Sequence, residues 1–154
     1  MDVKEIFSYM PFTNLVGIDL TTVEEGYAEG TVEMREELAS VPGGGVAHGG
    51  VTYSLADTVG GAAVISLTHD VAPTVDMRMD YLAPATDDLY AEAEVLRKGG
   101  NVAVASVDVY DADDHHVATA RGVYKTGGDS EGTPWLDGNG SDENGTDDEN
   151  VETF

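Results

Sequence analysis

HGGVTYSLADTVGGAAVISLTH, residues 48–69, is a largely apolar stretch that is long enough for about six turns of helix. We predict one long central helix over about residues 49–68. Asp57 is the only formally charged residue from Gly49 to Thr68. Because burying an unpaired carboxylate is costly, a lone acid in an apolar helix indicates a chemical role.

Two glycine pairs lie on either side of Asp57 in this helix. Gly49 and Gly50 predict an uncovered helix start, whose backbone N–H groups can meet negative charge. Gly60 and Gly61 each cost roughly 1 kcal/mol relative to alanine inside a helix, which makes sense if the sheet or a partner helix comes very close there. An acid in a helix and a donor site at a helix start are together suited to acyl-transfer hydrolysis.

Strand-like segments surround the predicted helix. We predict a short amphipathic helix at the N-terminus and strands both before and after the central helix: helix 3–10, strands 15–21, 27–35, 74–82, 89–97, 102–110 and 116–125. Strands and helices do not alternate along the chain. A doubly wound parallel sheet is therefore disfavoured. The order favours an α+β fold, in which a curved antiparallel sheet wraps around one long central helix.

The composition excludes several classes of function. The 154 residues suit one domain, and the lack of cysteine excludes disulfides, thiolate zinc sites and cysteine nucleophiles. With 30 acidic residues against 7 basic ones, the composition disfavours binding of nucleic acid through a basic surface. The acid-rich composition resembles that of proteins from salt-accumulating halophiles. In molar salt the Debye length is about 3 Å, so the repulsion between the many carboxylates is largely screened. A solubilising surface with an acidic tail is the alternative.

The ends of the chain and its apolar stretch bear on location. The first ten residues lack a basic region followed by an apolar stretch, so we expect a cytoplasmic protein without a secretory signal. Residues 51–67 are the one candidate membrane span, but an Asp at the midplane of a bilayer costs roughly 3 kcal/mol. Residues 127–154 hold 9 acidic and no basic residues, which predicts a disordered acidic tail after a domain of residues 1–126.

Three segments together resemble the PaaI-type hotdog-fold thioesterases over about residues 10–125: HGGVTYSLADT, TVDMRMDYLAPA (74–85) and VLRKGGNVAVASVDVYDADDHHVATARGVY (95–124). The most specific part is HGG followed seven residues later by the Asp of Leu-Ala-Asp-Thr. The resemblance implies a hotdog fold and hydrolysis of acyl-CoA or aryl-CoA thioesters. It implies no metal and no cofactor, since coenzyme A is part of the substrate.

The resemblance also assigns roles to single residues. Asp57 would act as general base or nucleophile, the Gly49 N–H would polarise the thioester carbonyl, and His48 would help to polarise or position the acyl group. Thr74, on the following strand, would lie near the catalytic water. Pro42 stands where the family pattern has an Asn that holds this water, so the positioning of the water departs from the family pattern.

Four further residues are candidates for substrate binding. Gly50 and Thr58 lie beside the residues already named. Arg97 and Lys98 are rare positive charges in this chain and are candidates to contact the phosphates of coenzyme A, although an ordinary surface hairpin is the alternative.

Structural alternatives exist for the main candidates. Asp57 could be a helix-surface acid or the partner of a buried Arg78, His48 could be a helix N-cap, and Thr74 is a good strand residue in any case. A group of acids and histidines in a predicted hairpin turn lacks the spacing of a calcium loop, so we expect solvated turn residues and no metal site: Asp111, Asp113, Asp114, His115 and His116.

Helical geometry bears on how many subunits form the site. His48 and Asp57 are nine residues apart, which is about 13.5 Å along a helix and about 900° of rotation, so they lie on opposite faces. A site that uses both therefore needs the helix start of one subunit and Asp57 of another, and so at least a symmetric homodimer. The resemblance agrees, because hotdog thioesterases place their sites at dimer interfaces and often form homotetramers.

Two other functions share these residues. A hotdog dehydratase or hydratase would also use a histidine and an acid, and formation of a double bond instead of a free thiol would identify it. A non-hydrolytic acyl-CoA-binding protein would keep the binding residues and lack the water site that Pro42 leaves without its Asn.

Overall fold

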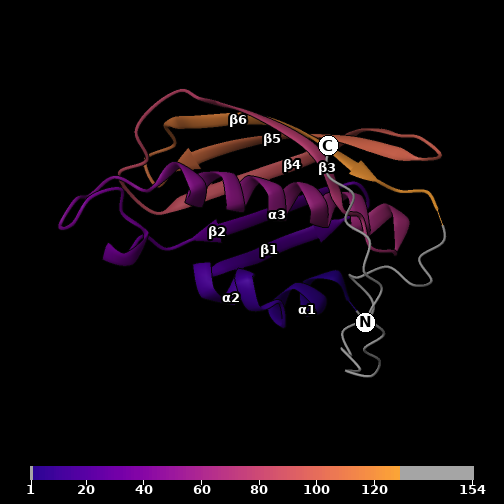
Figure 1. Cartoon of the computed structure of the whole chain (residues 1–154), viewed down its shortest axis with the longest axis horizontal. Coiled ribbons are helices and arrows are strands. Elements are labelled where there is room, and N and C mark those ends of the chain that lie inside the picture. Colours follow the sequence, from indigo (N-terminus) through magenta and orange to yellow (C-terminus); the bar gives the residue numbers. More distant parts are fainter. Residues whose placement is uncertain (1, 129–154) are drawn as a thin grey trace, which may run out of the picture.

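Six strands form one antiparallel sheet in the computed structural model, which describes residues 2–128 (Figure 1). The strand order is β1-β2-β4-β5-β6-β3, so β1 and β3 are the edges. The elements in chain order are α1 (Val3–Ser8), α2 (Pro11–Val16), β1 (Ile18–Glu24), β2 (Tyr27–Val32), the 3₁₀ turn η1 (Glu36–Leu38), α3 (Gly49–Thr68), β3 (Thr74–Tyr81), β4 (Leu89–Lys98), β5 (Val102–Asp111) and β6 (His116–Lys125).

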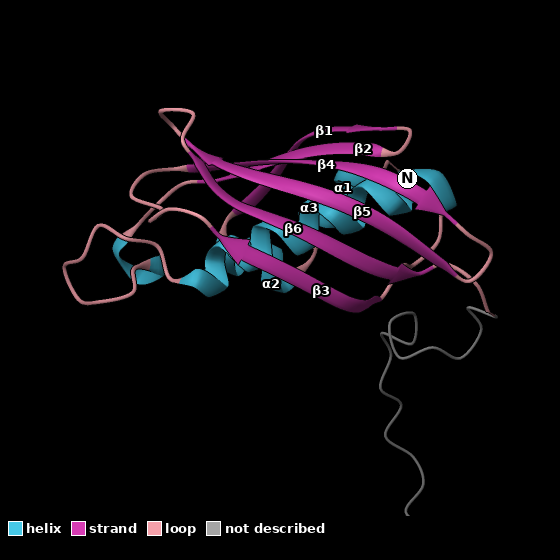
Figure 2. Cartoon of the chain, turned by 90° about the horizontal axis from the view of Figure 1, so that it is seen from above, coloured by secondary structure: helices cyan, strands magenta, loops and turns pink. Residues whose placement is uncertain are grey.

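Helix α3 lies along one face of this sheet, as seen from above in Figure 2. Its Leu55, Val59 and Val64 are fully buried in the core between helix and sheet. The inner positions of the strands are mostly small, so the helix packs closely against the backbone of the sheet: Ala28, Gly30, Ala91, Ala93, Ala103, Ala105, Ala118, Ala120 and Gly122. Within residues 2–128, no helix is long and apolar enough to cross a bilayer.

The prediction of the central helix and the four strands after it is confirmed, with bounds that agree within one residue. The predicted helix 3–10 and strand 27–35 are present as α1 and β2. The prediction between them is wrong, because residues 11–16 form a second helix where we expected loop and the start of a strand. Pro11 starts this helix at a position that needs no N–H donor. Gly17 ends it with a left-handed φ of 83°, so β1 begins only at Ile18.

The glycine pair inside α3 is explained for one of its two members. A Cβ on Gly60 would collide with the hydroxyl of Tyr124, whose side chain is fully buried beneath the helix. A Cβ on Gly61 would lie 3.6 Å from the same ring, which is ordinary contact, so the sheet of the same chain does not require glycine at that position. Of the predicted acidic tail, residues 129–154 lie outside the described residues.

Like charges face one another on the outer face of the sheet. Glu29 of β2 lies opposite Glu92 of β4, which in turn lies opposite Asp108 of β5. Hydroxyl groups of Thr22, Tyr27 and Tyr90 donate to the Glu29 carboxylate over 2.6–2.8 Å and lower its pKa. The lowered pKa keeps Glu29 ionised. The carboxylate row of Glu29, Glu92 and Asp108 is unfavourable, since carboxylates directly opposite one another destabilise a sheet.

We predict that KCl stabilises this fold. Raising KCl from about 0.1 M to about 3 M should raise the midpoint of thermal unfolding, because salt screens the carboxylate row. Glu92→Gln removes the central charge, so it should raise the midpoint in low salt and reduce the effect of KCl. Circular dichroism melts measure both quantities.

Glu94→Gln is the matched control for this prediction. Glu94 lies on the same face of β4 but opposite Tyr27 and Ser106, which carry no charge. The account of the row is wrong if the two variants respond to KCl in the same way.

Candidate functional site

Asp57 lies half-buried in the middle of α3, and the start of β3 supplies a donor to its carboxylate. The Thr74 hydroxyl donates to Oδ1 over 2.7 Å. Burial raises the pKa of Asp57, while the hydroxyls of Thr74 and Tyr124 act against this rise. A carboxylate with a raised pKa that is held by neutral donors is suited to accept a proton.

No cation neutralises Asp57 within residues 2–128. The suggested pairing with Arg78 is wrong, because Arg78 lies on the outer face of the sheet and pairs with Asp80 at 3.2 Å. Asp57 therefore remains a lone carboxylate within an apolar helix, which agrees with a chemical role.

Tyr124 is a residue near Asp57 that the sequence reasoning missed. Its hydroxyl donates to the backbone oxygen of Asp57 over 3.3 Å, and burial raises the pKa of Tyr124 so that it stays protonated. Gly60 and Gly122 leave the space for its ring, since a Cβ on Gly122 would lie only 2.6 Å from a ring carbon. The sequence gives only a weak indication that Tyr124 lies near Asp57, because this placement depends on Tyr124 facing inward opposite the glycines of the helix.

The start of α3 presents one free backbone donor. The Nδ1 atom of His48 caps the helix by accepting the N–H of Gly50 at 2.9 Å, so the N-cap interpretation of His48 is confirmed. The N–H of Val51 donates to the His48 oxygen at 2.8 Å. The N–H of Gly49 has no acceptor within residues 2–128, while the Tyr81 hydroxyl holds the Gly49 carbonyl at 2.7 Å. The helix start can thus donate to an incoming oxygen through Gly49.

Two contacts between α3 and β3, Asp57 with Thr74 and Gly49 with Tyr81, lie at opposite ends of β3. Thr74 begins this strand and contacts Asp57, while Tyr81 ends it and contacts Gly49. Because α3 is continuous from Gly49 to Thr68, Gly49 and Asp57 are separated by about 12 Å along its axis. One chain therefore does not bring the free donor and the lone carboxylate together.

The remaining candidates take different places. Thr58 is half-buried beside Asp57, whereas Pro42 is exposed in the loop before α3. Arg97 and Lys98 are exposed at the end of β4. The cross-strand row Lys98–Ala103–Tyr124–Thr74 places Lys98 three strand spacings from Thr74, about 14 Å, on the half of the sheet that carries the Asp57 pair.

The turn between β5 and β6 is organised by the Asp111 carboxylate. Asp111 is buried, and its carboxylate accepts the N–H groups of Asp113 and His115 and the ring nitrogen of His115 over 2.9–3.0 Å. The expectation that Asp111 is solvated is therefore wrong, because it anchors the turn. No group of three or more His, Cys, Asp or Glu side chains in the described part of the chain is placed to hold a metal ion.

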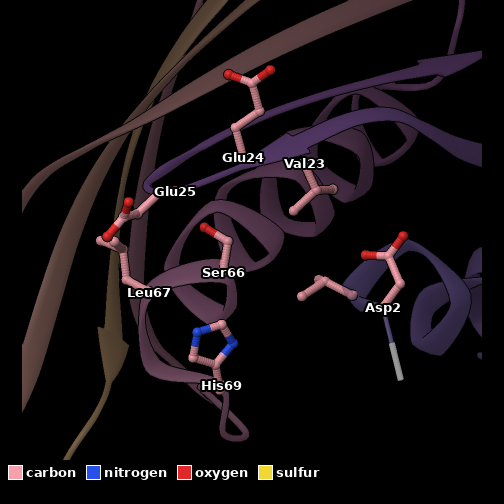
Figure 3. Close-up of a pocket in the computed structure, with 8 residues that line it drawn as sticks. Asp2, Val23, Glu24, Glu25, Ser66, Leu67 and His69 are labelled. Atoms are coloured by element: carbon pink, nitrogen blue, oxygen red, sulfur yellow. The ribbon is translucent and has the colours of Figure 1, made fainter.

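Two recesses lie at opposite ends of α3. The one in Figure 3, about 450 Å³, lies at the C-terminal end, and the acidic residues Asp2, Glu24 and Glu25 are among those that line it. Its Ser66 hydroxyl is already bonded to Ala63 and Gly26. The other, about 400 Å³, is apolar and is lined by Gly49 itself. The second recess therefore adjoins the free donor.

Comparisons with known proteins bear on the family and the fold. The family model described as "Thioesterase superfamily" matches residues 44–118. A Halobacterium salinarum protein that carries an esterase name is 36% identical over 123 residues, 73% of this chain and 82% of that protein. The medium/long-chain acyl-CoA thioesterase YigI of Salmonella typhimurium is 29% identical over 81% of this chain and 92% of its own length. The solved structure of the E. coli PaaI protein from the phenylacetic acid degradation operon has a TM-score of 0.74, with 27% identity over 82% of this chain and 91% of that chain.

We predict that Thr74→Val raises the pKa of Asp57. The substitution removes a donor that favours the ionised carboxylate, so protonation should occur at higher pH. The measurement is a ¹³C NMR titration of Asp carboxyl groups, in which Asp57→Asn identifies the resonance. Thr119→Val, on the outer face of the sheet, is the control, and an equal titration in both variants would contradict the assignment.

Proposed function

The chain belongs to the thioesterase superfamily, and on this premise we propose that it hydrolyses acyl-CoA thioesters to a free acid and coenzyme A. The observation that carries the proposal is a pair of groups on α3 that have no partner among residues 2–128: a carboxylate without a cation at Asp57 and an N–H without an acceptor at Gly49. Hydrolysis of a thioester needs a base for water and a donor for the oxyanion. The name of the Salmonella relative supports acyl-CoA as the substrate.

We propose that the active site forms between two copies of the chain that pair along β3. This edge strand is mostly exposed, and Val75, Tyr81 and Leu82 at its ends leave more than half of their surface in solvent. Antiparallel pairing of two β3 strands sets the Thr74 end of one copy beside the Tyr81 end of the other. Asp57 of one copy then approaches Gly49 of the other, and two equivalent sites result.

The reaction follows from this arrangement. The thioester oxygen accepts the Gly49 N–H at the positive end of the α3 dipole, and each such donor contributes roughly 3 kcal/mol in other hydrolases. Asp57 of the facing copy takes a proton from water as the water oxygen bonds to the carbonyl carbon. The C–S bond then breaks, and the proton passes to the leaving thiolate. In the alternative route the Asp57 carboxylate attacks the carbonyl carbon, the C–S bond breaks and coenzyme A leaves as the thiolate. Water then hydrolyses the resulting anhydride to the free acid and restores the Asp57 carboxylate.

Neighbouring residues support this chemistry in the proposed site. His48 caps the Gly50 N–H, which orients the first turn and leaves the Gly49 N–H for the substrate. Thr74 orients the Asp57 carboxylate and can contact the attacking water. Arg97 and Lys98 would contact the phosphates of coenzyme A. Pairing of two such dimers into a homotetramer is part of the same proposal.

A second candidate function is acyl-CoA binding without hydrolysis. Pro42 favours it, because proline offers no side-chain amide to hold the catalytic water. All the binding groups would still be present in such a protein. Tight binding of acyl-CoA without thiol release would identify this function.

Two substitutions test the catalytic groups one at a time. Asp57→Asn should lower thiol release from acyl-CoA at least roughly a thousandfold, since the base is lost. Gly49→Pro should lower it by about 10²–10³ because it removes only the N–H donor. Proline suits this first helical position, and His48 before it already has an extended backbone with φ −60° and ψ 137°.

Gly49→Ala is the control, because its Cβ would make ordinary contact with the Tyr81 ring at 3.4 Å and the N–H remains. The assay measures thiol release from short, long and aryl acyl-CoAs in concentrated KCl. If the folded wild type releases no thiol from any of them, hydrolysis is the wrong function. Full activity in Asp57→Asn would refute the role of that residue.

A further inference from the structure

Strand β3 has a neighbouring strand on one side only within residues 2–128, because it is an edge of the sheet (Figure 2). The Leu82 N–H, just after the strand, donates to the Val117 oxygen over 2.8 Å. From Asp76 onward, even-numbered residues therefore direct their backbone groups toward β6 and odd-numbered residues direct theirs toward the free edge. The Met77 oxygen accordingly accepts a side-chain hydroxyl, that of Tyr53, over 3.2 Å.

Charged side chains of alternating sign follow the outer face of this edge strand. They are Asp76, Arg78 and Asp80, and all three are exposed. Arg78 lies directly opposite Arg121 of β6, and like charges in that position destabilise a sheet. The ion pair of Arg78 with Asp80, at 3.2 Å, lies at the surface with both side chains more than half exposed. A further acid on the free side of β3 would therefore stabilise the Arg78–Arg121 pair.

The pairing of two β3 strands limits where the two-fold axis can pass. Thr74 of one copy lies beside Tyr81 of the other only if the axis passes near their midpoint, at Met77 or at Arg78, and the residue on the axis faces its own copy.

The charges on the outer face distinguish these two registers. With Arg78 on the axis, Arg78 and Arg121 of both copies form one row of like charges, and Asp76 faces Asp80. With Met77 on the axis, Arg78 of each copy faces Asp76 of the other. Only the second register sets opposite charges against each other.

We propose that Asp76 and Arg78 set the register of the pairing, with Met77 facing Met77 and each Arg78 bonded to Asp76 of the other copy. The proposal rests on the proposed function, because it takes the pairing of two β3 strands as given. Since the Met77 backbone groups point to the free edge, residue 77 forms a hydrogen-bonded pair with its copy. Positions 76 and 78 then form non-hydrogen-bonded pairs, in which side chains come closest.

The ion pairs act on the active site through this register. A shift of the axis by one residue replaces both ion pairs by repulsive contacts, and it also moves Asp57 of one copy relative to Gly49 of the other. An Arg guanidinium has several N–H donors, so Arg78 can hold its own Asp80 as well as the facing Asp76.

Cysteine cross-linking tests the register, because the chain has no cysteine of its own. Asp76→Cys and Arg78→Cys variants would be unfolded together, refolded in concentrated KCl and oxidised. Residues of a non-hydrogen-bonded pair have Cα atoms about 4.5 Å apart, which suits a disulfide. The mixture should form a cross-linked heterodimer, identified by its mass, in which the remaining Arg78 still faces an intact Asp76. Arg78→Cys alone should not cross-link.

Asp80→Cys mixed with Arg78→Cys is the matched control for this experiment. Asp80 is exposed on the same face of β3, two residues beyond Arg78, and it would face Arg78 only with Met79 on the axis. This mixture should therefore give no cross-link.

Charge reversal tests the ion pairs themselves. Asp76→Arg and Arg78→Asp each set like charges against each other, so each variant alone should raise the dissociation constant of the dimer at least about tenfold. The two variants mixed together face each other with opposite charges, and the constant should return to within about threefold of the wild-type value. Asp80→Arg is the control and should not weaken the dimer. Sedimentation equilibrium would be run in the lowest KCl concentration that keeps the wild type folded, since salt screens exposed charges.

These measurements separate the register from the function. If the mixed cysteine variants cross-link as described and the wild type releases no thiol from any acyl-CoA, the register is correctly assigned and hydrolysis is the wrong function. If the wild type releases thiol but Arg78→Cys cross-links with itself, or the dimeric mixture of cysteine variants does not cross-link, the register is wrong and hydrolysis stands. Charge variants that dimerise as weakly together as apart would overturn the ion pairs.

Discussion

The close contact of α3 with the inner face of the sheet at Tyr124 is the constraint on which the rest of the structure depends. The tyrosine ring fits only because Gly60 on the helix and Gly122 on the strand lack side chains. This contact fixes how far the helix lies from the sheet and brings the Tyr124 hydroxyl under Asp57. Gly60 lowers the stability of the helix by about 1 kcal/mol relative to alanine, but it leaves the space for the Tyr124 ring, whose hydroxyl contacts Asp57.

Two half-sites follow from this packing. The middle of α3 meets the start of β3 through Asp57 and Thr74, and the start of α3 meets the end of β3 through Gly49 and Tyr81. Each half-site has one group, a carboxylate or an N–H, that the described part of the chain leaves without a partner. Since β3 is an edge strand, pairing with the β3 strand of a second copy in the antiparallel direction is the simplest arrangement that brings the Asp57 half-site of one copy beside the Gly49 half-site of the other.

Much of this arrangement could be predicted from the sequence, because periodicity and charge mark it. A single acid in a long apolar segment identified both α3 and Asp57, and helical geometry separated Asp57 from the helix start. Other features depend on tertiary register, which periodicity does not contain: Tyr124 facing Gly60, and Asp111 buried as the anchor of a turn. Helix α2 was missed because it ends at Gly17, which adopts a left-handed φ. The residues around Gly17 have a strand-like pattern, which predicts a strand through this position instead of a helix end.

The shared site is the central claim, and complementation between two inactive variants tests it most directly. Asp57→Asn and Gly49→Pro subunits would be unfolded together in equal amounts and refolded in concentrated KCl, and thiol release from an acyl-CoA would be measured. If the site joins two copies, each mixed dimer regains one intact site, and the mixture should recover about a quarter of the wild-type activity. Activity no higher than that of the separate variants, with mixed dimers present, would contradict the account.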